Sequence, residues 1–323
     1  MRISLRVLAA LLIINLGQNA IAKGPVITDP EKADKDFEIQ GEYYGSINVD
    51  GEELAVGAQV IALGDGKFSS VGFYGGLPGK GWSRDMKKGH GTGEWEGNVV
   101  VVQDDTVKGT IRDGEMIVTH DGATLAKLKR IERKSPTLGQ KPPENAIVLF
   151  DGKSASEWVD GKVENGLLVH GTKSKRTFQN HKLHVEFRLP YQPNDRGQQR
   201  GNSGIYLQSR YEVQMLDSFG LEGENDECGG IYGIKKPDVN MCFPPLQWQT
   251  YDIEFRAANF EGAKMTEKPT MTVYHNGVLV HEKVELPKST TAAKMKPGPE
   301  PGPVYLQDHG NPVSYQNIWV VEL

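Results

Sequence analysis

Two β-strands and a tight connection between them are predicted in the stretch Gly201-Asn202-Ser203-Gly204-Ile205-Tyr206-Leu207-Gln208-Ser209-Arg210-Tyr211-Glu212-Val213-Gln214-Met215-Leu216-Asp217-Ser218. Alternate side chains of a strand share one face, so Glu212 and Gln214 point the same way. We expect a β-bulge at Met215-Leu216, because one extra residue would bring Asp217 onto that face. Two carboxylates and an amide on one sheet face suit polyol binding or acid–base chemistry; a solvated outer face is the alternative interpretation.

The rest of residues 146–323 also has the pattern of strands without intervening helices. The strand-like segments are residues 147–150, 166–170, 182–189, 249–256, 270–275, 278–282, 304–309 and 317–322. Asn276-Gly277 is a strong hairpin signal between two of them. Two long loops, 190–200 and 219–248, flank the Glu212 strand, and loops of this length are usually functional. The pattern predicts a jelly-roll β-sandwich.

The N-terminal part of the chain is predicted to form a separate domain. Residues 37–134 consist of short β-prone runs between glycine-rich turns, which indicates a small antiparallel β domain. Residues 135–145 are polar and rich in proline, as is typical of a linker. The fold class expected from the whole sequence is therefore all-β, with a small domain before the sandwich.

The first 22 residues have the pattern of a secretory signal peptide. Arg2 and Arg6 precede an apolar run at residues 7–14, and Ala20-Ile21-Ala22 follows it with the small residues of a cleavage site. We therefore expect export to the periplasm or the medium after cleavage near Ala22, and a mature chain without a membrane span. In an oxidising compartment, the only two cysteines, Cys228 and Cys242, are expected to form a disulfide.

The charge of the chain argues against nucleic acid as a partner. There are 37 Lys and Arg residues against 42 Asp and Glu, a net charge of −5, and the sequence contains no basic stripe. The sequence does not fix the oligomeric state.

Several blocks of the second domain resemble the 3-keto-disaccharide hydrolase domain family, formerly a domain of unknown function. They are residues 150–153 with Trp158, 201–218, 230–233, 248–253, 306–313 and 317–319. The resemblance covers about residues 145 to 323 and implies a concanavalin-like jelly roll. The Glu212 strand is also similar, more weakly, to that of bacterial laminarinases and lichenases, which carry Glu-x-Asp-x-x-Glu. Here Gln214 and Asp217 replace the second and third acids, which puts ordinary two-carboxylate glycosidase chemistry in doubt.

The family resemblance implies a glycosyl substrate that carries a ketone at C3. Such a ketone acidifies the C2 proton, so a base can form an enolate, the glycosidic oxygen can leave by elimination, and water can then add. We therefore expect an exported carbohydrate-active enzyme that cleaves 3-keto-glycosides such as 3-keto-disaccharides. A non-catalytic carbohydrate-binding protein and a conventional β-glucan hydrolase are the alternatives.

The chemistry needs a base near C2, an acid at the leaving oxygen and donors for the sugar oxygens. We expect His309 and Glu212 to supply the acid–base groups, with Asp217 orienting Glu212 or binding hydroxyls. The predicted substrate-binding residues are Asn202, Tyr206, Gln214, Tyr232, Trp248 and Gln307. No cofactor is required, although Glu212, Asp217 and His309 could together hold a divalent metal.

Overall fold

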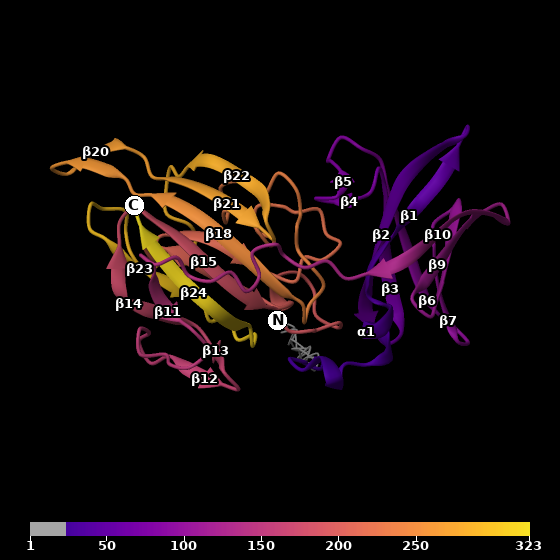
Figure 1. Cartoon of the computed structure of the whole chain (residues 1–323), viewed down its shortest axis with the longest axis horizontal. Coiled ribbons are helices and arrows are strands. Elements are labelled where there is room, and N and C mark those ends of the chain that lie inside the picture. Colours follow the sequence, from indigo (N-terminus) through magenta and orange to yellow (C-terminus); the bar gives the residue numbers. More distant parts are fainter. Residues whose placement is uncertain (1–23) are drawn as a thin grey trace, which may run out of the picture.

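The computed structural model describes residues 24–323, so the predicted signal peptide at residues 1–22 lies outside the described residues. Two β domains lie side by side, a barrel from the first part of the chain and a sandwich from the second (Figure 1). The predicted all-β fold, with a jelly-roll sandwich preceded by a smaller β domain, is confirmed.

The N-terminal domain is a closed antiparallel barrel with the strand order β1-β10-β9-β8-β7-β6-β3-β2. Its strands are β1 (Gly41–Val49), β2 (Glu52–Gly64), β3 (Lys67–Tyr74), β6 (Lys88–Glu96), β7 (Val99–Gln103), β8 (Val107–Arg112), β9 (Glu115–His120) and β10 (Ala123–Ile131). Asp-Gly pairs make four of the hairpin turns, at 50–51, 65–66, 113–114 and 121–122. Both residues of each pair have positive φ, as the tight turns of twisted hairpins require.

Short elements close one end of the barrel and connect it to the sandwich. A 3-10 turn, η1 (Pro30–Lys32), and the helix α1 (Lys35–Ile39) precede β1, and the Asp34 side chain caps α1 by accepting from the Phe37 amide. Upstream of them, Ile27 pairs with Tyr191 of the sandwich through two backbone hydrogen bonds of 3.0 and 2.8 Å. The pair β4 (Leu77–Pro78) and β5 (Gly81–Trp82) lies between the barrel and the sandwich (Figure 1).

The sandwich consists of a large and a small antiparallel sheet. The large sheet has the order β12-β13-β24-β15-β18-β21-β22, with β11 also paired to β24, and the small sheet has the order β14-β23-β16-β17. The large-sheet strands are β11 (Ile147–Phe150), β12 (Lys162–Glu164), β13 (Leu167–Val169), β15 (His181–Arg188), β18 (Trp248–Arg256), β21 (Thr270–His275), β22 (Val278–Glu285) and β24 (Ser314–Glu322). The small-sheet strands are β14 (Thr172–Phe178), β16 (Ser203–Leu207), β17 (Tyr211–Met215) and β23 (Gly302–Leu306). A 3-10 turn, η2 (Gly197–Gln199), and the hairpin β19 (Asn259–Glu261) and β20 (Lys264–Glu267) complete the domain.

The two sheets bury one continuous apolar core between them. From the small sheet, Ile205 and Val213 point into it, and from the large sheet Phe187 and Phe255 do so. Because side chains alternate along a strand, the neighbours of Ile205 and Val213 point to the opposite face of the small sheet. That outward face is covered by the long loops of the domain, and it carries the candidate site.

Two details differ from the sequence prediction. First, β16 and β17 pair without any shift in register, and the ladder ends at Met215, so the expected bulge at Met215-Leu216 is wrong. The chain instead turns away from the sheet, where the Ser218 amide donates to the Leu216 carbonyl at 2.7 Å. Second, Cys228 and Cys242 are free, buried thiols in this structure, which does not contain the expected disulfide.

The segment between the domains is fixed on the outer face of the large sheet. The Thr137 hydroxyl donates to Asp252 at 2.7 Å, and the Gly139 amide donates to Glu186 at 2.6 Å. Between these two carboxylates lies the buried His184, whose Nδ1 is 2.6 Å from Asp252. The pKa of His184 is raised, because both carboxylates favour its charged form although burial opposes it.

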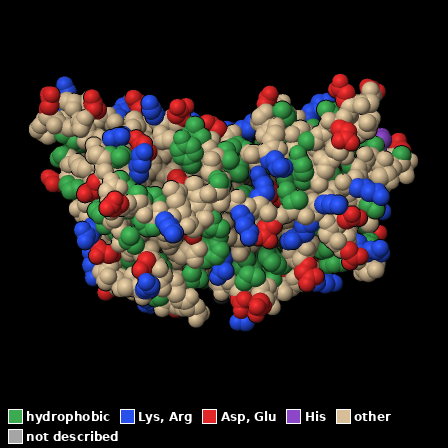
Figure 2. All heavy atoms as spheres, in the orientation of Figure 1, with side chains coloured by type: hydrophobic (Ala, Val, Ile, Leu, Met, Phe, Trp, Pro, Cys, Tyr) green, Lys and Arg blue, Asp and Glu red, His purple; other side chains and the backbone are tan. Residues whose placement is uncertain are grey.

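The barrel and the sandwich are joined by an apolar cluster and by arginine side chains. Phe73 and Trp82 of the barrel domain pack with Phe219 of the sandwich. The Arg84 guanidinium donates to four backbone carbonyls of the loop between β17 and β18, those of residues 222, 223, 237 and 238, at 2.8 to 2.9 Å. Charged side chains of both signs are interspersed over the face seen in Figure 2.

Within residues 24–323, none of the helices has the length and apolar character needed to cross a membrane.

Candidate functional site

A carboxyl group and a phenol are in contact on the covered outer face of the small sheet. Glu212 of β17 and Tyr206 of β16 are register partners, and their side chains are 2% and 0% exposed. The Tyr206 hydroxyl donates to Glu212 Oε2 at 2.7 Å. Gly204 makes room for the carboxyl group, since a Cβ on this glycine would lie 2.1 Å from Glu212 Oε1. The outward positions of this strand pair therefore hold a buried acid in a fixed orientation.

The hydrogen bonds around Glu212 are compatible with both of its protonation states. Burial raises the pKa of Glu212 to about 7, even though the hydrogen bond from Tyr206 acts to lower it. Tyr206 has one hydroxyl hydrogen and two acceptors, Glu212 Oε2 and the Thr291 carbonyl at 2.9 Å. When Glu212 is ionised, Tyr206 donates to it. When Glu212 is protonated, its own O–H can donate to Tyr206 while Tyr206 donates to Thr291.

Buried amides line the face next to Glu212. Gln214 follows on the same side of β17, and its Nε2 donates to Gln198 Oε1 at 3.1 Å and to the Asp226 carbonyl at 3.3 Å. Asn202 Nδ2 donates to the Gln198 carbonyl at 2.8 Å and to its Oε1 at 2.9 Å. The buried Asn202 Oδ1 has no hydrogen-bond partner within the described part of the chain. A buried acceptor of this kind is free to bind a ligand hydroxyl or a water.

The accessible edge of the site contains an amide and two further phenols. Gln307 follows β23, and its Nε2 donates to the Tyr206 oxygen at 3.3 Å. The Tyr305 ring lies 5.2 Å from the Tyr206 ring, and Lys294 Nζ lies 5.5 Å above Tyr305. Tyr232 is half-buried, and its amide donates to the Glu212 carbonyl at 3.2 Å. Aromatic faces beside hydrogen-bonding groups are well suited to binding sugar rings.

Asp217 has a different environment from the one expected for it. Its carboxylate accepts from Arg200 Nε at 2.6 Å, and both side chains of this ion pair are buried. The Asp217 amide donates to the Arg200 carbonyl at 3.1 Å, which explains why the chain leaves the sheet after Met215. Arg200 also reaches the Ala62 carbonyl of the barrel at 3.3 Å. The ion pair with Asp217 therefore fixes Arg200 in the loop before β16, and Arg200 in turn contacts the barrel edge.

His309 and Trp248 lie outside the buried part of the site. His309 is exposed, in the turn after Gln307. Trp248 begins β18 in the large sheet, where the Arg188 guanidinium lies 5.0 Å from its ring. Between residues 24 and 323, no three His, Cys, Asp or Glu side chains gather closely enough to hold a metal ion, so Glu212, Asp217 and His309 do not form a ligand set in this structure.

Two residues of the site, Gln198 and Tyr305, are not predicted from the sequence. Tyr305 precedes Gln307 by two positions, so strand periodicity could have placed both on one face. Gln198 joins Asn202 to Gln214 through its side chain. It lies in η2, within an irregular loop, and no local pattern could have identified it.

Comparisons with known proteins match the second domain. The family model described as "3-keto-alpha-glucoside-1,2-lyase-like domain" matches residues 145–321. A crystal structure of a "putative glycosyl hydrolase" from Parabacteroides distasonis ATCC 8503 is 34% identical, with a TM-score of 0.51, over 56% of this chain and 85% of that one. A second structure from the same organism, with the same description, is 19% identical with a TM-score of 0.41, over 56% of this chain and 94% of that one. Among curated proteins, no sequence matches this chain.

Proposed function

We propose that this chain, which belongs to the family of the 3-keto-alpha-glucoside-1,2-lyase-like domain, cleaves 3-keto-glycosides by elimination followed by hydration. The family match and the 34% identical structure make the chain a carbohydrate-active protein. The observation that carries the finer assignment is the buried Glu212 in contact with Tyr206, on a sheet face lined by amides and phenols.

In the proposed reaction, Glu212 removes the proton from C2 of the keto-sugar. A pKa of about 7 supports this role, because near neutral pH a large fraction of the group is ionised and yet basic enough to take a proton. The electron pair of the C2–H bond moves to the C3 oxygen and forms an enolate. Asn202, Gln214 or Gln307 can donate an amide N–H to that oxygen as its charge develops.

Cleavage of the bond between C1 and the glycosidic oxygen follows. The enolate re-forms the ketone, the new double bond joins C1 and C2, and the C1–O electron pair leaves with the oxygen. That oxygen needs a proton, which Glu212 can return through Tyr206 or which His309 can supply from the edge of the site. Water then adds to the double bond, with its hydroxyl at C1 and a proton at C2, so the net reaction is hydrolysis.

The environment of Asp217 favours this route over conventional hydrolysis. A two-carboxylate glycosidase needs a second carboxyl group that is free to act as an acid, base or nucleophile. On the Glu212 strand, the neighbouring outward position is the amide Gln214, and Asp217 is neutralised by Arg200. The elimination route needs only one base on this face.

Export is part of the proposed function. The amino-terminal pattern at residues 1–22 supports it. If cleavage follows Ala22, N-terminal sequencing of the protein recovered outside the cytoplasm will begin at Lys23. A cytoplasmic protein that retains residues 1–22 would contradict export.

The activity is tested by incubating the purified mature chain with a 3-keto-disaccharide and, separately, with its unoxidised parent. We expect cleavage of the keto-sugar alone, with solvent deuterium incorporated at C2 of the product when the reaction runs in D2O. Cleavage of the parent alone would favour a conventional β-glucan hydrolase. Sugar binding without cleavage of either would favour a non-catalytic binding protein.

Variants locate the chemistry on the outer face of the small sheet. Glu212→Gln is expected to abolish C2 exchange and cleavage together, because the amide cannot take the proton. If His309 rather than Tyr206 protonates the leaving oxygen, His309→Ala will slow cleavage more than C2 exchange. Glu254→Gln, a half-buried position on the large sheet where Glu254 pairs with Lys182 and Arg256, is the matched control and should keep wild-type turnover. Full activity in both Glu212→Gln and His309→Ala would contradict the site assignment.

A further inference from the structure

The N-terminal barrel is filled by large side chains at one end and is hollow at the other. At the end next to α1, Tyr43, Phe68 and Trp95 belong to the barrel core. The Trp95 indole donates to Asp36 of α1 at 2.7 Å, and the Tyr43 hydroxyl donates to the Ile39 carbonyl at 2.8 Å. Large, hydrogen-bonded side chains therefore close this end.

Small residues leave space inside the opposite end. Phe68, Ser70 and Gly72 alternate along β3 and share the inward face. The register partners of Ser70 and Gly72 on β6 are Gly91 and Gly89. A Cβ placed on Gly72 would meet no atom within 4 Å, which shows that this position borders open space. Eight-stranded barrels can hold one small ligand where side chains do not fill the interior.

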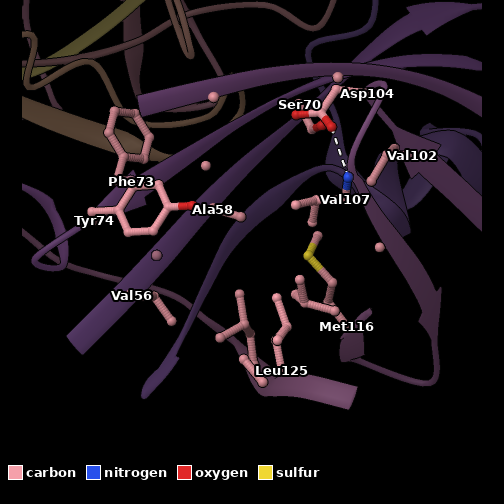
Figure 3. A pocket seen from close by; sticks show the side chains of 18 of the residues that line it. Val56, Ala58, Ser70, Phe73, Tyr74, Val102, Asp104, Val107, Met116 and Leu125 are labelled. Carbon is pink, nitrogen blue, oxygen red and sulfur yellow. Dashed lines mark hydrogen bonds between the residues drawn. The ribbon is translucent and has the colours of Figure 1, made fainter. Parts of the chain in front are cut away.

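The resulting cavity measures about 170 Å³ and its lining is mainly apolar. Val56, Val107 and Met116 line it from three different strands or their ends, and Tyr74 and Leu125 lie at its edge (Figure 3). An apolar cavity of roughly 150 Å³ in a protein is large enough to bind benzene. The volume therefore corresponds to one six-membered aromatic ring.

From this geometry we propose that the open end of the barrel is a binding site for a small neutral aromatic molecule. The ring would contact Val56, Val107 and Met116, whose thioether sulfur makes favourable contacts with aromatic rings. A polar substituent on the ring would face the wall at Ser70, whose hydroxyl is half-buried and makes no side-chain hydrogen bond within residues 24–323. The site lies outside residues 145–321, so it is separate from the keto-sugar chemistry.

The charge at the cavity wall favours a neutral ligand over an anionic one. Asp104 Oδ1 accepts from the amides of Thr106 and Val107, each at 2.7 Å, in the turn between β7 and β8 (Figure 3). These hydrogen bonds hold the pKa of Asp104 below its usual range, so the carboxylate stays charged. Asp104 Oδ2 is 3.7 Å from where a Cβ on Gly89 would be, and Gly89 itself lines the cavity. An aromatic carboxylate would be repelled by this group.

Met116 provides a direct test of binding. Its side chain lines the cavity and is buried, whereas Met241 and Met271 are buried in the sandwich core. In the mature chain labelled with [13C-methyl]methionine, phenol is expected to shift the Met116 methyl signal saturably and to leave Met241 and Met271 unchanged. Benzoate is expected to bind more weakly than phenol.

Variants that fill the cavity are expected to abolish the phenol-induced shift of the Met116 methyl signal. Gly72→Leu and, independently, Ser70→Leu place a side chain in the space assigned to the ring, and the Met116 shift should be lost in both. Thr92→Leu, on the outer face of the adjacent strand β6, is the matched control and should respond like the wild type. Circular dichroism checks that each variant is folded. A Met116 signal that phenol leaves unchanged, or an unaltered response in a folded Ser70→Leu, would overturn the assignment, and equal affinity for benzoate would overturn the choice of a neutral ligand.

Discussion

Replacing Glu212 by glutamine should change how the stability of the protein depends on pH. The pKa of Glu212 is raised by burial from an ordinary value of 4.5 to about 7, so the folded protein holds this proton more tightly than the unfolded chain does. Proton binding by Glu212 therefore stabilises the folded state to its full extent below pH 4.5, and this stabilisation is lost as the pH rises through 7. Glutamine cannot ionise, and it keeps a hydrogen-bonding group next to Tyr206.

The difference between the ordinary pKa of a glutamate, 4.5, and the pKa of about 7 of Glu212 sets the size of the change in stability. Each pH unit across this interval corresponds to about 1.4 kcal/mol, so the wild type should lose about 3 kcal/mol relative to Glu212→Gln between pH 4.5 and pH 8. Because the side chain is only 2% exposed, solvent screening does little to reduce this figure. Between pH 4.5 and pH 8 the variant should thus gain this much stability relative to the wild type, and it should lack the catalytic base at every pH.

Urea unfolding of both proteins from pH 4 to pH 9 measures the difference in the free energy of unfolding. Glu222→Gln is a useful control, because Glu222 is exposed and pairs with Lys88, which lowers its pKa. The difference in unfolding free energy between Glu222→Gln and the wild type should change less with pH, and in the opposite direction. A difference curve for Glu212→Gln that is flat between pH 4.5 and pH 8, or that rises in favour of the wild type, would refute the reasoning.

Three further substitutions test how the site is supported. Gly204→Ala would place a Cβ 2.1 Å from Glu212 Oε1, and the displaced carboxyl should lower kcat/KM on a 3-keto-disaccharide about 100-fold, measured by steady-state kinetics. Arg200→Met leaves Asp217 buried without its partner and should cost about 3–5 kcal/mol in urea unfolding, part of which Asp217→Leu in the same chain should restore. Arg84→Ala removes the donors to four carbonyls of the loop after β17, so hydrogen–deuterium exchange there should become faster while exchange in the sandwich core stays unchanged.

The strands and one face of the site could be predicted because their signals are local. Alternation along β16 and β17 is enough to place Tyr206, Glu212 and Gln214 on the same side, and the ladder confirms that register. The Asn276-Gly277 pair indicates the hairpin between β21 and β22 for the same reason. A side chain that is set by its own strand or turn can be identified from the sequence.

What could not be predicted depends on contacts between distant segments. The bulge was expected in order to align Asp217 with Glu212, but Asp217 is fixed by Arg200, 17 residues earlier in the chain. The closure of the barrel depends on β1 pairing with β10, which nothing in either strand indicates. The pKa of Glu212 follows from burial by loops that are far from it in sequence. Glu212 could therefore be identified as a site residue from the sequence, but its raised pKa could not be predicted.

The loop between β17 and β18 is held by Arg84 only through backbone carbonyls. Every amino acid has a carbonyl, so at residues 222, 237 and 238 this attachment does not depend on the side chain. Gly223 is the exception, because its φ is positive and a Cβ there would lie 2.9 Å from Arg84 Nη2. The anchored positions, 222–223 and 237–238, are separated by a stretch that includes Tyr232 at the edge of the site. During evolution, the positions of that stretch outside the core, such as Tyr232, can therefore change and acquire new sugar preferences while the attachment to the neighbouring domain is retained.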